Sequence, residues 1–206
     1  YVNWDKSSFT TLEDFGGSLN MIFPEWFFVH QGKDTAYRQI DTAALRLMRD
    51  FNLEIVPVLS NFSQGFNPEN VRDVLNSPVK RKKFIYNLVR IMDQYNFFGI
   101  NIDFEEMTPS DNGPLINFYR ELHDTFAEKK YIIVCDISPK NLDPEFINEV
   151  KDYCDYFVLM AYDQHYSLGS PGPVSAYPWT EHLLDTIGEC CGLQKFILGF
   201  AGYGYD

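Results

Sequence analysis

The segment Phe97–Glu105, FFGINIDFE, places polar side chains at alternate positions of an otherwise apolar strand. Successive side chains of a strand point to opposite faces, so Asn101, Asp103 and Glu105 share one face and the apolar residues share the other. The apolar face suits a protein core, whereas an amide and two carboxylates in a row are groups that carry out chemistry. An ordinary half-exposed strand with a polar outer face is the alternative interpretation, and the surrounding sequence decides between the two.

Strand-like segments rich in Ile, Val and aromatic residues recur along the chain, as in parallel strands that are buried on both faces. The seven segments are 1–4, 19–23, 54–59, 99–104, 131–135, 156–160 and 196–200. Helical patterns lie between several of them, at Thr35–Phe51, Ser77–Tyr95, Leu115–Lys129 and Pro144–Asp152. This alternation of strand and helix predicts an α/β fold with a parallel sheet and helical crossovers.

A sheet of this kind is either doubly wound or closed as a (β/α)8 barrel. No GxGxxG turn follows the first strand, so a dinucleotide-binding version loses support. Acidic and aromatic residues instead follow the carboxyl ends of several strands, where barrel enzymes build their active sites. They include Asp5, Glu25, Trp26, Asn61, Asp103, Glu105, Asp136, Tyr162, Asp163 and Tyr203. We therefore predict a (β/α)8 TIM barrel that is C-terminally truncated after the seventh strand, or whose eighth strand is supplied from elsewhere.

The composition predicts one compact domain over residues 1–206. The missing eighth strand indicates that this domain is a fragment of a larger chain. Of the 206 residues, 45% are hydrophobic and 17% are aromatic, which is enough for a sizeable core. The formal net charge of -12 argues against nucleic acid or anionic membrane as a partner, because surfaces that bind phosphate are basic. No apolar run approaches the roughly 20 residues of a membrane span, and the first residues show no targeting pattern, so any signal or anchor would lie outside them.

The cysteines give no sign of a metal site. Cys135, Cys154, Cys190 and Cys191 show no CxxC spacing, and no histidine lies near them in a zinc-like pattern. Cys135 and Cys154 lie in or beside apolar strands, where cysteine usually packs in the core. Adjacent cysteines such as 190 and 191 rarely bridge each other without strain, so the redox compartment stays open.

Three motifs resemble those of glycoside hydrolase family 18. FGINIDFEE, at Phe98–Glu106, resembles the family's DxxDxDxE signature, with Glu105 at its final acid and Asp103 at the acid before it. FVLMAYD, at Phe157–Asp163, resembles the MxYD motif of the sixth strand, and KFILGFAGYGYD, at residues 195–206, resembles the seventh-strand segment. The motifs follow the family's order and spacing, and the likeness covers nearly the whole chain.

The resemblance implies hydrolysis of β-1,4-linked N-acetylglucosamine polymers by substrate-assisted, retaining catalysis, an exception to the two-carboxylate scheme. The substrate's own 2-acetamido oxygen would attack the anomeric carbon, while Glu105 protonates the leaving oxygen and later activates water. Asp103 would orient the acetamido N–H, stabilise the oxazolinium charge and raise the proton affinity of Glu105 by like-charge repulsion. The phenol of Tyr162 would donate a hydrogen bond to the acetamido oxygen. No cofactor is implied.

Two positions depart from the family signature. Phe98 replaces its first aspartate, at a position that serves mainly packing. Asn101 replaces the second, so Asp103 lacks its usual carboxylate neighbour; the amide can still hydrogen-bond Asp103 but offers no charge to share a proton, which bears on the pH profile. The eighth strand, whose tryptophan forms the floor of the family's sugar site, lies outside these residues.

Further side chains are predicted to contact the substrate, with Met160 beneath the sugar. They are Asn101, Met160, Asp163, Asp136, Tyr203 and Trp26. Asp136 either lines the cleft or caps the turn that follows it, and both roles stay open. Trp26 and Trp179 are named as surfaces on which a sugar could stack, although tryptophan is as often part of a core.

The expected function is cleavage of a polysaccharide that contains N-acetylglucosamine, with peptidoglycan or a bacterial exopolysaccharide ahead of chitin. A catalytically silent, lectin-like domain of the same fold is the alternative, but such members typically replace the glutamate that is Glu105 here. A regulatory or scaffolding domain of a larger cell-envelope protein is a third class. We expect an extracytoplasmic or cell-envelope location and covalently fused neighbouring domains.

Overall fold

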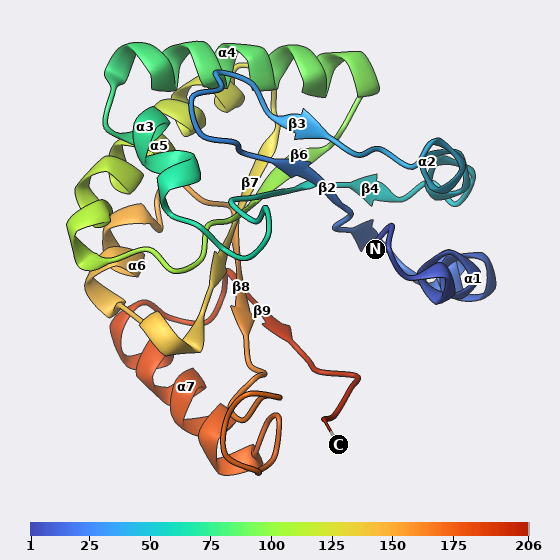
Figure 1. Ribbon diagram of the computed structural model, residues 1–206, viewed down its shortest axis with the longest axis vertical. Coiled ribbons are helices and arrows are strands. Elements are labelled where there is room, and N and C mark those ends of the chain that lie inside the picture. Colours follow the sequence, from blue (N-terminus) through green and yellow to red (C-terminus); the bar gives the residue numbers. More distant parts are fainter. Residues whose placement is uncertain (206) are drawn as a thin grey trace. The chain divides into compact units, whose positions relative to one another are not determined.

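The computed structural model describes residues 1–205, leaving aside the side chain at position 141; Asp206, the last residue of the third motif, lies outside the described residues. The contacts divide the chain into two compact units, residues 1–133 and residues from 134 onwards. Strand β7 (Ile132–Ile137) spans the division. In both units strands alternate with helices along the chain (Figure 1), as an α/β fold requires.

The first unit contains four hydrogen-bonded strands in the order β3 (Tyr37–Arg38), β2 (Glu25–Phe28), β5 (Val58–Ser60) and β6 (Gly99–Asp103). Strands β2, β5 and β6 are parallel, and β3 is antiparallel to β2. A separate parallel pair consists of β1 (Met21–Ile22) and β4 (Glu54–Ile55). All three residues of β5 and the first four of β6 are buried, as expected for strands covered on both faces.

The helices of the first unit are α1 (Lys6–Phe15), α2 (Thr42–Asp50), α3 (Glu69–Leu75), α4 (Pro78–Tyr95) and α5 (Asn112–Ala127), with short 3-10 turns η1 (Gly16–Ser18) and η2 (Pro109–Asp111). Three of these five helices, α1, α2 and α4, begin at a residue whose side chain caps them. The Ser77 side chain accepts a hydrogen bond from the Lys80 amide, and the left-handed residue Asn96 ends the helix. The predicted helix at 77–95 is therefore confirmed, whereas the one at 35–51 begins only after its cap, Asp41.

Aromatic side chains fill the core of the first unit. The Phe97 ring lies 6.2 Å from that of Trp26 and 5.9 Å from that of Phe27. Between α4 and α5, the Phe84 and Phe118 rings lie 6.5 Å apart. Gly99, which begins β6, has no room for a side chain, because a Cβ there would collide with the backbone of Ile132.

The second unit consists of the parallel strands β7, β8 (Tyr156–Met160) and β9 (Phe196–Gly199), in that order. Its helices are α6 (Pro144–Val150) and α7 (Tyr177–Cys190), and a 3-10 turn η3 (Pro139–Asn141) follows β7. Stacked rings of Phe157 and Phe196, 5.0 Å apart, join β8 to β9. The Asp143 side chain accepts from the Phe146 amide, which confirms the helix start predicted at Pro144.

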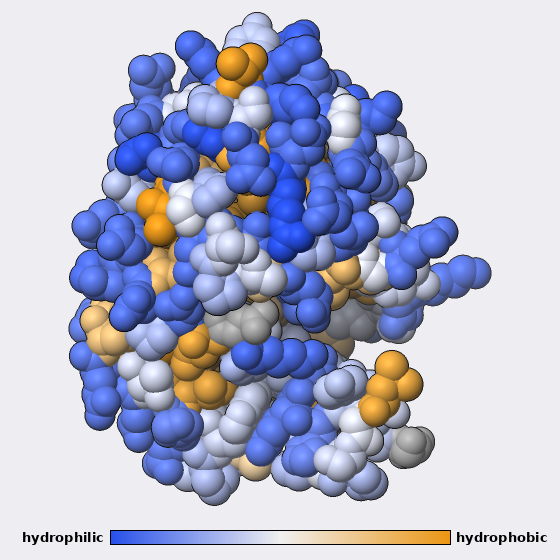
Figure 2. All heavy atoms as spheres, turned by 60° about the vertical axis from the view of Figure 1, so that its left-hand side comes forward, coloured by the Kyte–Doolittle hydropathy of each residue, from blue (hydrophilic) through white to orange (hydrophobic). Residues whose placement is uncertain are grey.

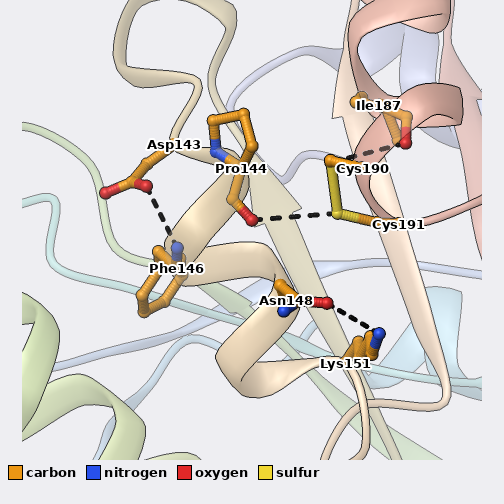
Figure 3. The surroundings of a disulfide bond; sticks show 8 residues. All are labelled: Asp143, Pro144, Phe146, Asn148, Lys151, Ile187, Cys190 and Cys191. Atoms are coloured by element: carbon orange, nitrogen blue, oxygen red, sulfur yellow. Dashed lines mark hydrogen bonds between the residues drawn. A yellow bond between two sulfur atoms is a disulfide. The ribbon is translucent and has the colours of Figure 1, made fainter.

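The two adjacent cysteines form a disulfide. Figure 3 shows Cys190 bonded to Cys191 at the carboxyl end of α7, with Cys191 Sγ 3.8 Å from the carbonyl oxygen of Pro144, the first residue of α6. The bond thus lies where α7 meets α6. Cys135 and Cys154 are buried thiols, as predicted for core residues; burial raises the pKa of Cys154, and its hydrogen bond with Cys135 adds to this effect.

The strand predicted at 1–4 is wrong. Only Tyr1 bonds in a strand-like way, its nitrogen donating to the Phe23 oxygen at 3.1 Å and its oxygen accepting from the Glu25 nitrogen at 2.9 Å. Asp5 then caps α1 by accepting from the Ser7 amide, so the chain enters a helix instead of extending the sheet. The segment predicted at 54–59 forms two strands, β4 and β5, on either side of Pro57, which has no N–H for a ladder.

On the face drawn in Figure 2, hydrophilic side chains predominate and hydrophobic ones form small groups, as the large acidic excess leads one to expect. Within the described residues, no helix is long and apolar enough to cross a membrane. The described strands also form no closed ring of hydrogen bonds, so a barrel is not seen in them.

Candidate active site

The polar face of β6 is formed as the sequence predicts. Asn101 lies opposite Val58 and Asp103 opposite Ser60 of the neighbouring β5, so the alternate residues of β6 point the same way. Asn101 is buried, and Asp103 and Glu105 keep part of their surface exposed. The strand ends at Asp103, and two residues later Glu105 emerges at its carboxyl end.

The carboxyl group of Asp103 is set up to hold a proton. Its Oδ1 atom is buried, with no hydrogen-bond partner in the part of the chain that the structure describes. Burial, followed by the negative charges of Glu105 and Glu25, raises the pKa of Asp103 to about 7, although a hydrogen bond with Ser60 acts in the opposite direction. An ordinary aspartic acid titrates near pH ~4, so Asp103 keeps a proton under conditions where an exposed aspartate has lost it.

Asn61 fixes the backbone at Glu105, a role that the sequence analysis did not predict. Its side chain is fully buried, its Nδ2 donates to the Glu105 carbonyl oxygen at 2.9 Å, and its Oδ1 accepts from the Glu105 amide at 3.0 Å. Asn70 Nδ2 in turn donates to the Asn61 carbonyl oxygen at 2.9 Å. The only sign of this in the sequence was the position of Asn61 at the end of an apolar strand.

The backbone turns sharply just after Glu105. Glu106 has a φ of 59°, in the left-handed region that side chains other than glycine seldom adopt, and it is exposed. Such a conformation costs about 1 kcal/mol or more and persists only where the surroundings enforce it. It ends the extended course of the chain directly after Glu105.

The proposed sugar contact of Trp26 does not agree with its position. The side chain has no exposed surface, its Nε1 donates to Asn3 Oδ1 at 2.8 Å, and its ring packs against those of Tyr1 and Phe97. A ring without an accessible face cannot stack on a sugar. Trp26 is therefore a core residue, and Trp179, half-buried in the first turn of α7, is the candidate that keeps accessible surface.

The second unit gathers four of the predicted residues at the carboxyl end of β8. Met160 is the buried last residue of that strand, and Tyr162 and Asp163 follow it. The Tyr203 hydroxyl donates to Asp163 Oδ1 at 2.8 Å, and the Tyr203 ring lies edge-on to that of Tyr162 with centroids 6.3 Å apart. Burial, together with this hydrogen bond to the Asp163 carboxylate, raises the pKa of Tyr203, so the phenol stays protonated.

Asp163 has a second phenol partner and an unusual backbone conformation. Tyr205 also donates to Asp163 Oδ1, at 2.9 Å, so one carboxylate oxygen holds two phenols. Asp163 has a φ of 57°, the same left-handed turn after a strand end that Glu106 makes in the first unit. Asp136, half-buried near the end of β7, lies opposite Val158 of β8.

The described residues offer no group of three or more His, Cys, Asp or Glu side chains that could hold a metal ion. A hollow of about 480 Å³ in the first unit lies at the amino ends of β4 and β6, lined by residues such as Arg49, Glu54, Phe98 and Lys130. None of the predicted site residues lines it, since those of this unit lie at or near the carboxyl ends of strands.

Several known proteins are similar to this chain in sequence. The "Uncharacterized glycosylase YvbX" of Bacillus subtilis is 24% identical over 221 residues, covering 100% of this chain and 63% of that protein. The "Cortical fragment-lytic enzyme" of Bacillus subtilis is 27% identical over 164 residues, covering 75% of this chain and 38% of that enzyme. The chain thus spans less than two thirds of the length of these relatives.

Solved structures show the same fold. The Bacillus cereus spore cortex-lytic enzyme SleL matches 94% of this chain, and 46% of its own, with a TM-score of 0.85 at 19% identity. A chitinase from Chromobacterium violaceum matches 94% of this chain, and 64% of its own, with a TM-score of 0.83 at 18% identity. The model of the family "Glycosyl hydrolases family 18" matches residues 31–206. The chain therefore belongs to family 18 of the glycosyl hydrolases.

Proposed function

We propose that this chain is the catalytic part of a glycosidase that cleaves β-1,4-linked polysaccharide containing N-acetylglucosamine. The observation that carries the proposal is the pair formed by Asp103 and Glu105 at the end of β6. Asp103 has a buried carboxyl oxygen and a pKa raised to about 7, and Glu105 emerges beside it from a backbone fixed by Asn61. Two coupled carboxyl groups of this kind suit a reaction in which a proton is given and later taken back.

In the proposed mechanism the substrate's 2-acetamido oxygen is the nucleophile. It attacks the anomeric carbon as the glycosidic bond breaks, and Glu105 gives its proton to the leaving oxygen. When the one proton of the pair is on Glu105, the ionised Asp103 accepts a hydrogen bond from the acetamido N–H and stabilises the positive charge of the oxazolinium ion. Water then attacks the anomeric carbon, the bond from that carbon to the acetamido oxygen breaks, and Glu105 takes up the water proton. Two inversions leave the net configuration retained.

Residues of the second unit complete the proposal. The phenol of Tyr162 donates a hydrogen bond to the acetamido oxygen, and Met160 lies beneath the sugar. Asp163 and Tyr203 support Tyr162, because the Tyr203–Asp163 hydrogen bond and the Tyr162–Tyr203 ring contact hold the three residues in one cluster. Asn101 and Asp136 are retained as contributors to the polar wall of the site.

Peptidoglycan or a bacterial exopolysaccharide is the proposed substrate, ahead of chitin. The names of the cortical fragment-lytic and spore cortex-lytic relatives support this order, while the chitinase of the same fold keeps chitin as the second choice. An extracytoplasmic or cell-envelope location follows from such a substrate. Covalently fused neighbouring domains are part of the proposal, and the greater length of the relatives supports them.

The fold proposed for the site is a single (β/α)8 barrel domain to which both units belong, truncated after its seventh strand. The parallel strands of each unit and the likeness to chitinase and SleL structures support this arrangement. The barrel would bring the carboxyl ends of β6 and β8 to one rim, where this fold carries its active sites. A lectin-like domain is not favoured, because Asp103, Glu105 and Tyr162 all stand at the motif positions.

A direct test is hydrolysis of defined oligomers. Purified peptidoglycan, poly-N-acetylglucosamine exopolysaccharide and chitin oligomers would be incubated with the protein, and the products identified by mass spectrometry with the anomeric configuration followed by NMR. We expect cleavage with the β-configuration retained in the first product. Binding without cleavage of any of the three polymers would favour the lectin-like alternative instead.

A further inference from the structure

Glu25 lies on the same face of the sheet as the acids of β6. It is opposite Val58 of β5, and Val58 is opposite Asn101 of β6, so Glu25 and Asn101 stand in one row across three strands. Residues in one row of a parallel sheet point to the same side. A register shift between Glu25 and Phe27 places Phe28 opposite Ser60, in the row that contains Asp103. Glu25 is thus two positions along the sheet from Asp103, on the same side.

The sequence analysis places Glu25 among the acids near strand ends but gives it no role, and the sheet register now relates it to Asp103. Glu25 is half-buried, and burial raises the pKa of its carboxyl group. The charges that face Asp103 within the first unit are those of Glu105, on the same segment, and Glu25, on β2, while Ser60 of β5 offers a hydrogen bond.

We propose that Glu25 is a positioning residue whose negative charge helps the Asp103–Glu105 pair to retain the one proton that the two acids share, a role that Asn101 of β6 cannot take because it is neutral. When the pair formed by Asp103 and Glu105 loses its last proton, it carries two negative charges. The negative charge of Glu25 across the sheet makes this loss harder by like-charge repulsion. Glu25 thereby sets the pH above which the Asp103–Glu105 pair loses the proton that the reaction uses. The catalytic consequence rests on the proposed function, whereas the electrostatic one does not.

The electrostatic part is tested by a carboxyl ¹³C NMR titration of the labelled protein. The variants are Glu25→Gln, Glu25→Asp and the double variant Glu25→Gln with Asn101→Asp, with Glu54→Gln on the exposed side of β4 as the matched control. We expect the apparent pKa of Asp103 to fall by about one pH unit in Glu25→Gln and to stay near the wild-type value in Glu25→Asp and the control. The double variant, which returns a charge to the neighbourhood on β6, should bring the value back up.

Glu25→Asp separates the charge from the shape of the side chain, because it keeps the carboxylate but shortens the stem. If Asp103 titrates identically in wild type and Glu25→Gln, or if Glu25→Asp shifts it as far as Glu25→Gln does, the inference is overturned. Should Glu25→Gln not fold, the wild-type titration is followed at the carboxyl carbons of both Glu25 and Asp103. Because interacting acids titrate together, the Glu25 signal should show a step at the apparent pKa of Asp103, and a Glu25 signal without that step would contradict the inference.

The catalytic part is read from the pH dependence of kcat/KM on the oligomer that the wild type cleaves. The alkaline limb is expected to move to lower pH in Glu25→Gln and to return in the double variant, because that limb reports loss of the shared proton. A merely structural role would lower activity at every pH and leave the limb in place. A wild type that cleaves none of the polymers would refute the proposed function alone, since the titration stands without it.

Discussion

The side-chain amide of Asn61 forms two hydrogen bonds with the backbone of Glu105, one from each of its ends, across 44 residues of sequence. Nδ2 donates to the carbonyl oxygen at 2.9 Å, and Oδ1 accepts from the amide nitrogen at 3.0 Å. An amide is the side chain that offers a donor and an acceptor side by side, which matches a peptide backbone. The end of β5 thereby holds the residue proposed as general acid at the end of β6.

We expect Asn61→Ala to lower both stability and turnover. The substitution leaves the N–H and the C=O of Glu105 without these partners and opens a buried space, which costs about 2–3 kcal/mol in the free energy of unfolding. Urea unfolding measures this cost, and the exposed Asn76→Ala serves as the control with a change within about 0.5 kcal/mol. At a temperature where the variant is folded, kcat should fall while KM changes little; unchanged kcat would mean that the bonds only stabilise the fold.

Glu105→Gln is expected to lower kcat by at least about a hundredfold, since an amide cannot donate a proton to the leaving oxygen. The neighbouring Glu106→Gln is the control, because Glu106 is exposed and differs from Glu105 by one position. Both variants would be assayed on the oligomer that the wild type cleaves. Turnover of Glu105→Gln close to that of Glu106→Gln would remove Glu105 from the mechanism.

The acetamido group of the substrate is expected to be indispensable. Oligomers without the N-acetyl group at the cleaved sugar should bind but not react, and a thiazoline mimic of the cyclic intermediate should inhibit competitively. Calorimetry measures the binding, and product analysis measures the cleavage. Efficient hydrolysis of fully deacetylated oligomers would contradict the roles proposed for Asp103 and Tyr162.

The ion pair between Arg72 and Asp111 predicts a particular dependence of stability on pH. Arg72 Nε donates to Asp111 Oδ1 at 2.9 Å, and the Thr108 amide donates to Oδ2 at 2.9 Å. The hydrogen bond with Arg72, followed by those from Thr108, outweighs burial and lowers the pKa of Asp111 to about 2. Because the folded value lies below the ordinary ~3.9, the ionised group stabilises the fold above about pH 4, and this contribution is lost as the pH falls towards 2.

Asp111→Asn should therefore lower the free energy of unfolding by about 1 kcal/mol near neutral pH, after allowance for solvent around the partly exposed Arg72. The difference from the wild type should shrink steadily below about pH 4. Urea unfolding over this pH range measures it, with Asp73→Asn, in an exposed pair with Lys80, as the control. A difference that stays constant with pH would show that the loss comes from packing and not from the charge.

The local patterns of the sequence were enough to predict α4, the start of α6 and the acids of β6, whereas β2, β3, α1, α3 and α7 were not predicted. Alternation along β6 depends on the period of two of a strand, and the start of α4 depends on Ser77 and Pro78, both of which are fixed by neighbours in the chain. The prediction of a strand at 1–4 was wrong because it considered only the composition of these residues, which is compatible with a strand. Asp5, directly after them, favours the start of a helix.

The partners of these acids were decided by the tertiary structure. Asn61 meets Glu105, and Glu25 shares a row with Asn101, only because β2, β5 and β6 pair in one register, and a register joins residues that are far apart in sequence. Trp26 illustrates the same limit: its residue type suits a sugar or a core equally, and its contacts with Tyr1 and Phe97 place it in the core. The sequence by itself determined which chemical groups the strand ends carry, because residue type and period are local. Only the tertiary structure determined which of them are buried, paired or charged next to one another, because burial and electrostatic coupling depend on distances in space.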